Sequence, residues 1–274
     1  MKITYIPHQA SYEVSLSSEC PFFNEGKSTL TYDIEVKHIK SEGQVYFIEV
    51  SKTNVLMNDE EVQDAFNDVL LMTAEAINKV VVRINDSGTV IGLGNFEEIK
   101  KKWFDVRKVV EEMYQGEVIS DYLDGMQAKL ESPEVLLNAL SKSFFYTVFF
   151  NGIYKNYIDS ESLQEEMIIR DLLPTQGVGV LVDQRLLMDT EEDACLLSIK
   201  GTEEFDGINE LTKDFFKDLA KTGGLPEMCL VEIEGTYNIL PASGVINRIS
   251  MEVQVTYDTF YRKNMQIEII KKSH

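Results

Sequence analysis

The segment from Lys79 to Met113 constrains the fold most, because it predicts a β-hairpin followed directly by a long helix. Val80, Val82 and Ile84 alternate with Val81 and Arg83, as in a strand with one buried face. Asp86-Ser87-Gly88 supplies a turn with a glycine that tolerates positive φ, and the β pattern resumes at Val90. We therefore expect two antiparallel strands joined by a tight turn.

The helix that follows has a start signal and a buried stripe. Asn95 is a favourable N-cap residue and Glu98 stands three residues later, so the pair predicts a capping box. Apolar side chains then recur at steps of three and four, which places them on one face: Phe96, Ile99, Trp103, Val106, Val110 and Met113. We expect this face to pack against a core.

Long β patterns at both ends of the chain enclose a helical middle. Residues 11–51 predict an antiparallel meander with turns at 20–26 and 41–43. After Val178 the β pattern returns, and strands are predicted at 229–237, 244–257 and 264–271. Helices are predicted from Asn58 onward and at 117–130, 133–157 and 207–221. Ser132 and Pro133 are suited to cap and start the 133–157 helix, which is apolar nearly all round.

We therefore predict an α+β fold, in which curved antiparallel sheets from the N- and C-terminal parts pack against a central helical segment. With 44% apolar residues, the 274-residue chain has ample material for a core, and residues 1–274 are expected to form a single α+β unit. Similar Ser-Gly turns near both ends leave an alternative open. In it, two pseudo-repeated β-rich parts, 1–115 and 175–274, are joined by a helical segment, 116–160. Whether the ends form one sheet or two stays open.

Charge and composition exclude several classes of partner. The net charge is −20, from 46 acidic and 26 basic residues, which argues against nucleic acid and favours a basic protein partner. The longest apolar run, Phe144–Phe150, is far shorter than the roughly 20 residues that span a bilayer, so no membrane insertion is expected. The N-terminus lacks an apolar core of signal-peptide length, and the three cysteines form no CxxC pattern, so we expect a cytoplasmic location. The oligomeric state stays open.

A search for catalytic chemistry returns no motif. His8, His38 and His274 are scattered and have no nucleophile motif beside them. The acidic clusters lack the alternating oxygen ligands and central glycine of a calcium loop. Gly92-Leu93-Gly94-Asn95 lacks the third glycine of a dinucleotide fingerprint and the Gly-Lys-Ser/Thr of a P-loop. We therefore predict no catalytic residue, no cofactor and no metal.

Large aromatic side chains are the remaining candidates for a binding surface. They gather in the predicted 133–157 helix and near the C-terminus. Such side chains are common at interfaces, although the alternative that they form ordinary core stays open. The candidate interface residues are Phe144, Phe145, Phe149, Phe150, Tyr154, Tyr157, Tyr257, Phe260 and Tyr261.

Two segments carry a resemblance to known sequences. The stretch DSGTVIGLGNFEEIKKKW and the C-terminal GTYNI and SGVINRISMEVQVTY resemble uncharacterised proteins of the Bacteroidota. Some of those proteins are lipoproteins with curved sheets similar to lipoprotein-carrier folds. The resemblance implies a curved sheet and no catalytic residue. Because residues 1–14 show neither an apolar core of signal-peptide length nor a lipobox cysteine, we expect this chain to depart from the lipoprotein members.

Together these features predict a non-enzymatic protein-binding module. An adaptor or chaperone for a secreted effector would fit, as would an immunity protein that blocks a basic toxin of an interbacterial system, because opposite charge speeds association. The alternative is a carrier whose half-barrel groove holds a hydrophobic small molecule or lipid, with the aromatic helix as a lid. An enzyme whose site is assembled from distant carboxylates is a third hypothesis.

Overall fold

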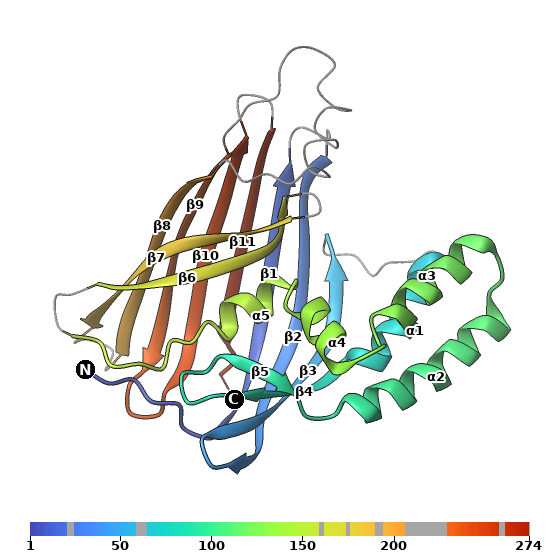
Figure 1. The fold of residues 1–274 in the computed structure, drawn as a ribbon, viewed down its shortest axis with the longest axis horizontal. Coiled ribbons are helices and arrows are strands. Elements are labelled where there is room, and N and C mark those ends of the chain that lie inside the picture. The colour runs from blue at the N-terminus through green and yellow to red at the C-terminus, as the bar shows by residue number, and fades with distance from the viewer. Residues whose placement is uncertain are drawn as a thin grey trace.

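One large antiparallel sheet dominates the protein (Figure 1). The computed structural model describes residues 1–20, 25–58, 65–158, 162–173, 176–189, 194–205, 229–257 and 261–273. Within them the 11 strands of the sheet follow the order β5-β4-β3-β2-β1-β11-β10-β9-β8-β7-β6. The strands are β1 (Gln9–Cys20), β2 (Glu25–Glu42), β3 (Val45–Met57), β4 (Lys79–Ile84), β5 (Val90–Leu93), β6 (Leu163–Leu173), β7 (Gln176–Asp189), β8 (Ala194–Phe205), β9 (Cys229–Leu240), β10 (Val245–Tyr257) and β11 (Tyr261–Lys271).

The first and last strands of the chain are neighbours in the middle of this sheet. Val14 of β1 lies opposite Tyr32 of β2 on one side and opposite Ile269 of β11 on the other. The predicted α+β fold, with curved sheets from the two ends packed against a central helical segment, is therefore wrong. The ends combine because pairing β1 with β11 satisfies backbone groups that two separate sheets would leave open at their edges.

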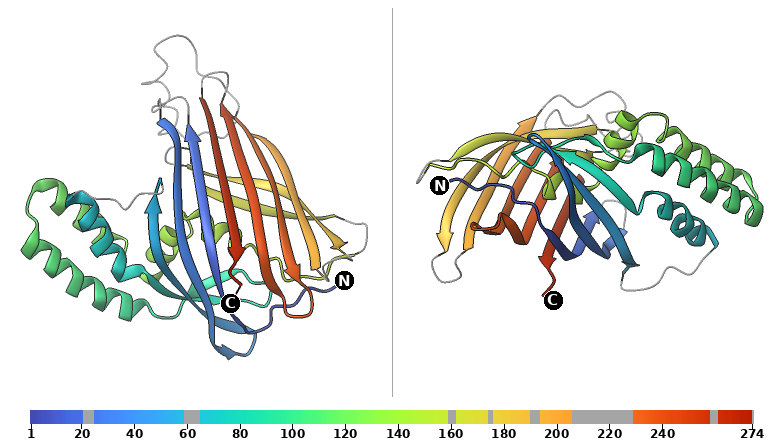
Figure 2. Two further views of the ribbon diagram at one scale, coloured as in Figure 1. Left: turned by 180° about the vertical axis from the view of Figure 1, so that it is seen from behind. Right: turned by 90° about the horizontal axis from the view of Figure 1, so that it is seen from below.

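Alternation along the strands gives the sheet one apolar and one polar face. On β9, Val231, Ile233 and Tyr237 are buried, whereas Glu232 and Glu234 between them are exposed. We call the apolar side the inner face and the polar side the outer face. Figure 2 shows that no helix of the described residues covers the outer face of β1, β2, β10 and β11. This one-sided pattern is typical of an antiparallel sheet that packs a core on one face and meets water on the other.

The helices lie against the inner face or beside the sheet (Figure 1). α4 and α5 cover part of the inner face, and α2 and α3 extend away from the sheet next to α1. At the opposite end of the sheet β6 curls toward α5, and the Tyr157 hydroxyl donates to Gln184 Oε1 of β7 at 3.2 Å. The helices are α1 (Ala65–Ala74), the 3₁₀ turn η2 (Glu75–Ile77), α2 (Phe96–Met113), α3 (Glu117–Ala128), α4 (Pro133–Leu140) and α5 (Phe144–Phe149).

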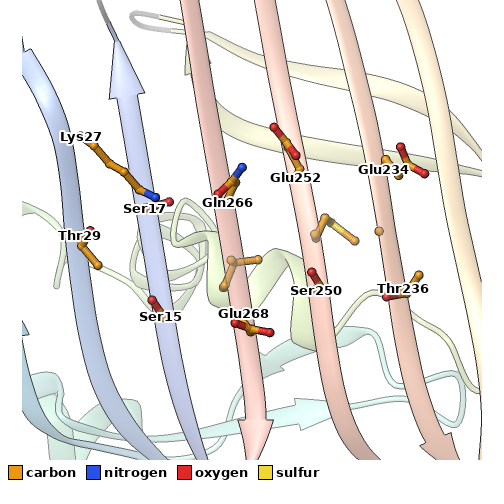
Figure 3. A pocket seen from close by; sticks show the side chains of 13 residues that line it. Ser15, Ser17, Lys27, Thr29, Glu234, Thr236, Ser250, Glu252, Gln266 and Glu268 are labelled. Atoms are coloured by element: carbon orange, nitrogen blue, oxygen red, sulfur yellow. The ribbon is translucent and has the colours of Figure 1, made fainter.

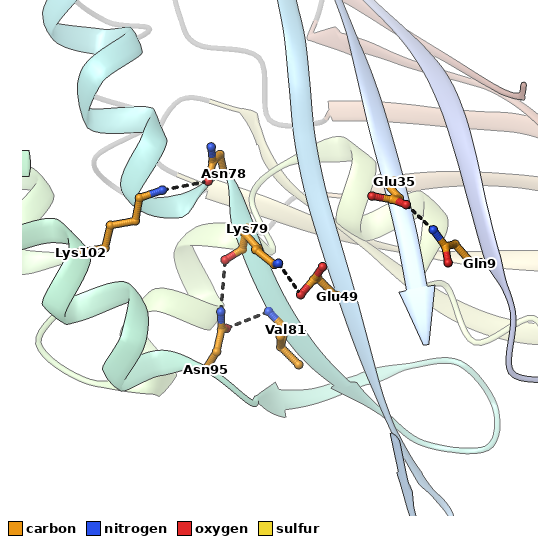
Figure 4. Close-up of polar contacts among 8 residues, drawn as sticks. All are labelled: Gln9, Glu35, Glu49, Asn78, Lys79, Val81, Asn95 and Lys102. Carbon is orange, nitrogen blue, oxygen red and sulfur yellow. Dashed lines mark hydrogen bonds and ion pairs between the residues drawn. The ribbon is translucent and has the colours of Figure 1, made fainter. Parts of the chain in front are cut away.

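The predicted hairpin and helix at 79–113 are confirmed as β4, β5 and α2, but the capping box is wrong. The Asn95 side chain does not cap α2. Its Oδ1 accepts from the Val81 amide at 2.8 Å and its Nδ2 donates to the Lys79 carbonyl at 3.2 Å (Figure 4). Asn95 therefore fastens the start of the helix to β4. The predicted stripe is buried at Ile99, Trp103 and Val110, whereas Met113 is 62% exposed.

The single helix predicted at 133–157 is wrong, because two short helices occupy this segment. The predicted start is confirmed, since Ser132 Oγ accepts from the Val135 amide at 3.3 Å and Pro133 is the first helical residue. α4 then ends at Leu140, and the Ser141 hydroxyl donates to the Asn138 carbonyl at 2.8 Å. Serine side chains that bond to nearby carbonyls compete with helix hydrogen bonds, which explains the break between α4 and α5.

Several sequence predictions fall partly or wholly outside the described residues. These are most of the turn at 20–26, the helix start at 59–64 and the helix at 207–221. The turn at 41–43 is confirmed by Gly43 at φ 62°, and the hairpin turn by Gly88 at φ 88°. The division into parts 1–115, 116–160 and 175–274 stays a prediction.

Candidate functional site

An apolar cavity of about 620 Å³ lies between the inner face of β2 and β3 and the helices α1, α4 and α5. Its size falls within the range of about 300–1,000 Å³ that is usual for small-molecule sites. Tyr32, Ile34 and Val50 form the sheet wall, because period-two alternation turns these residues inward. Leu70 of α1 and Phe145 of α5 contribute to the opposite wall.

An irregularity in β3 shapes one end of the cavity. Asn54 has φ 52°, a left-handed conformation, and the register between β2 and β3 shifts between Thr31 and Asp33. The Asn54 side chain donates to Asp33 Oδ2 at 2.8 Å, which fixes the irregular backbone. Such a bulge bends its strand, and here it lies where Val55 and Met57 continue the cavity lining.

The aromatic helix α5 is tied to the sheet and forms a wall of the cavity. The buried Tyr237 hydroxyl of β9 donates to the Val148 carbonyl at 2.8 Å. Phe149 contacts Tyr12 of β1 edge to face, with ring centroids 5.2 Å apart, and Phe145 stacks on Phe149 at the same distance. These contacts hold Phe145 at its place in the cavity lining.

Lys52 is the one cationic side chain among the described residues that line this cavity. Its Nζ lies 3.9 Å from the centroid of the Tyr32 ring, a cation–π contact. Burial lowers the pKa of Lys52, because a charged ammonium is poorly solvated among apolar side chains. Burial also raises the pKa of the Tyr32 and Tyr146 phenols, which therefore stay neutral.

Two other hollows are more polar. One of about 480 Å³ lies between the β4–β5 turn, α5 and β6, and there Lys155 Nζ pairs with Glu165 Oε1 at 2.6 Å. The other, of about 490 Å³, lies on the outer face across β2, β1, β11, β10 and β9. Figure 3 shows that it is lined by side chains such as Ser15, Ser250 and Glu268. The cavity with Lys52 is the larger and more apolar site, so we take it as the candidate functional site.

The predicted interface residues lie mostly inside the chain. Phe144, Phe145, Phe149, Phe150, Tyr157, Tyr257 and Tyr261 are buried, Tyr154 is partly buried, and Phe260 lies outside the described residues. Phe145 lines the cavity, whereas Tyr257 and Tyr261 form a cross-strand pair of β10 and β11. The role of these residues at a protein interface stays a prediction.

Sequence reasoning missed Lys52, Tyr32 and Tyr146. A signal for Lys52 was present, because Ile48, Val50 and Lys52 continue one alternation and a lysine therefore occupies an inward position. The pattern does not show what faces that position, since η2, α4 and α5 come from distant parts of the chain.

The described residues show neither a metal cluster nor a membrane-spanning helix. No group of three or more His, Cys, Asp and Glu side chains within the described ranges is arranged to hold a metal ion. None of the helices in that same part of the chain combines the length and apolar character needed to cross a bilayer.

Comparison with known proteins adds a distant structural similarity. No family model matches the sequence, and no curated protein matches it. Among solved structures, the chain is similar to one titled "lipid-protein interactions in lipovitellin", with a TM-score of 0.48 and 9% sequence identity. The similarity covers 99% of this chain and 25% of the other, so the chain spans about a quarter of that protein's length. The lipid–protein interactions named in that title are those of lipovitellin.

Proposed function

We propose that the protein is a non-catalytic carrier that binds a hydrophobic small molecule or lipid in the cavity between β2, β3, α1, α4 and α5. The observation that carries this proposal is the cavity of about 620 Å³ with its largely apolar lining. Binding would transfer the ligand's apolar surface from water to the side chains of Ile34, Val50 and Phe145. This transfer stabilises a complex by about 25 cal/mol for each Å² removed from water.

The wall of the cavity is suited to a ligand of variable shape. One side is formed by β2 and β3 of the sheet, and the other by α1 together with α4 and α5, which come from two different parts of the chain. Met57 and Leu71 line the cavity and are 49% and 47% exposed, so apolar surface continues from the interior to the solvent. A ligand could enter along this surface without first breaking the sheet.

The adaptor, chaperone and immunity-protein hypotheses have less support. They rest on the acidic net charge and on large aromatic side chains, most of which are buried within the chain. Net charge alone indicates solubility as much as recognition of a partner. We therefore place the carrier first.

A cavity-filling substitution tests the proposal. Ala139 of α4 lines the cavity, so the Phe side chain of Ala139→Phe would occupy part of its volume. Ala128, at the exposed end of α3, is not part of the lining, and Ala128→Phe is the matched control. Binding of decanol, an uncharged amphiphile, would be measured by calorimetry for the wild type and both variants.

We expect decanol to bind the wild type with one molecule per chain. Ala139→Phe should weaken binding at least about tenfold, a change of about 1.4 kcal/mol, and Ala128→Phe should leave it unchanged. Absence of binding to the wild type, or equal binding to all three proteins, would contradict the proposal.

A further inference from the structure

Lys52 occupies a position of β3 where the alternation of the strand predicts an apolar, inward-facing side chain. It follows Ile48 and Val50 on the inward-facing side of β3 and lies opposite Ile34 of β2. Its backbone amide donates to the Asn78 carbonyl at 2.8 Å, which holds this part of β3 beside η2. The backbone therefore directs the side chain into the cavity.

The charge of Lys52 has no anionic partner in the described part of the chain. Its contact there is the Tyr32 ring, and no ion pair within the described residues joins it to Glu75, which lines the same cavity. Two other polar groups of the lining have partners elsewhere: Asn54 donates to Asp33, and Asn78 Oδ1 accepts from Lys102 Nζ at 3.3 Å (Figure 4). An ammonium among apolar side chains is costly unless it is paired.

The neighbouring cavity provides an internal comparison. There Lys155 also lines a hollow, and it is neutralised within the chain by Glu165 at 2.6 Å. In the larger cavity Glu75 is the one acidic residue of the described lining, and no ion pair joins it to Lys52. A counter-ion brought by the ligand would complete the same kind of pair.

We infer that the ligand is an amphiphile with a single carboxylate head group, of the fatty-acid class, and that its carboxylate pairs with Lys52 while its alkyl chain lies against Ile34, Val50 and Phe145. This inference rests on the proposed carrier function. A single carboxylate matches the single cation of the described lining, whereas a phosphate carries up to two negative charges. A charge-assisted hydrogen bond from an ammonium to a carboxylate is about twice as strong as a neutral one.

The test compares decanoic acid with decanol, which share a chain length and differ in the head group. Binding of both ligands at neutral pH would be measured for the wild type, Lys52→Met and Lys37→Met. Lys52→Met keeps most of the side-chain volume and removes the charge. Lys37→Met is the matched control, because Lys37 is exposed on the outer face of the adjacent strand β2 and its replacement changes the net charge equally.

We expect the wild type to bind the acid at least about tenfold more tightly than the alcohol. Lys52→Met should remove this preference, and its continued binding of the alcohol would show that the variant is folded. Lys37→Met should retain the preference.

Equal affinity of the wild type for acid and alcohol would overturn the inference and leave the carrier function standing. A preference that persists in Lys52→Met would also overturn it. If the wild type binds neither ligand, the carrier function itself fails. The comparison of the two ligands on the wild type needs no variant, so the inference stays testable even if Lys52→Met does not fold.

Discussion

Tyr12 and Tyr237 lie fully buried on the inner face of the sheet and differ in what their hydroxyls meet. The Tyr237 hydroxyl donates to the Val148 carbonyl and so ties α5 to β9. The Tyr12 hydroxyl has no hydrogen-bond partner among the described residues, although its ring contacts Phe149. The Tyr237 hydroxyl therefore stabilises the position of α5. The Tyr12 side chain contributes through the packing of its ring on Phe149.

This difference predicts opposite results for the same substitution. Tyr237→Phe removes a buried hydrogen bond and should lower the free energy of unfolding by about 1–3 kcal/mol. Tyr12→Phe removes an unpaired buried hydroxyl, so it should leave the stability unchanged or raise it slightly. Denaturant unfolding of both variants measures the difference, and an equal loss in the two would contradict the hydrogen-bond assignment.

Among the secondary-structure elements, the β4–β5 hairpin is held in place by Tyr154, a residue from outside the hairpin. Tyr154 donates its amide to the Ser87 carbonyl at 3.1 Å and its hydroxyl to the Gly244 carbonyl, also at 3.1 Å. Its ring is thus held at both ends and packs on Gly88, where a Cβ would come within 2.5 Å of Tyr154 Cδ2. The hairpin turn is therefore part of the packing as well as a connection.

Two glycine substitutions distinguish the stability lost to backbone conformation from the stability lost to a steric clash. Gly88 and Gly43 both have positive φ, but a Cβ on Gly43 would meet nothing within 4 Å. Gly43→Ala should cost about 1–2 kcal/mol for the left-handed conformation alone. Gly88→Ala should cost about 1–3 kcal/mol more, because the Tyr154 ring cannot move aside. Thermal or denaturant unfolding checks this, and equal losses would show that the ring yields.

Across the whole molecule, tyrosines from the inner face of the sheet, from α5 and from the segment after α5 are wholly or partly buried. Burial raises the pKa of each of them above the usual value of 10.0. They are Tyr12, Tyr32, Tyr146, Tyr154 and Tyr237. Each phenol stays protonated in the folded chain at a pH where the unfolded chain has released its proton.

We therefore expect the protein to lose stability at alkaline pH. The contribution of these tyrosines is fully present below their unfolded pKa of about 10, and it is lost as the pH rises from there through their raised folded pKa values. One pH unit above 10, each fully buried tyrosine such as Tyr12 should account for about 1.4 kcal/mol of lost stability. Denaturant unfolding at a series of pH values, with tyrosinate absorbance as a second signal, measures this. A flat stability curve above pH 10 would contradict it.

Local structure followed from local sequence. The turn at Gly88, the Ser132 cap, the long alternating strands and the buried stripe of α2 were all predicted, because each depends on residues within a few positions of one another. Where a residue's partner lay farther away in the sequence, the prediction was wrong. The side chain of Asn95, for example, accepts a hydrogen bond from Val81 of β4 and does not cap α2.

Local sequence patterns are enough to specify long strands with one apolar face, a hairpin that leads into an amphipathic helix, and a strongly acidic composition. Tertiary structure alone decided that β1 and β11 join the ends into one sheet, and that Lys52 faces a cavity closed by α1, α4 and α5. This is because the alternation of apolar and polar residues shows which face of a strand is apolar, whereas pairing between distant strands determines which elements pack against that face.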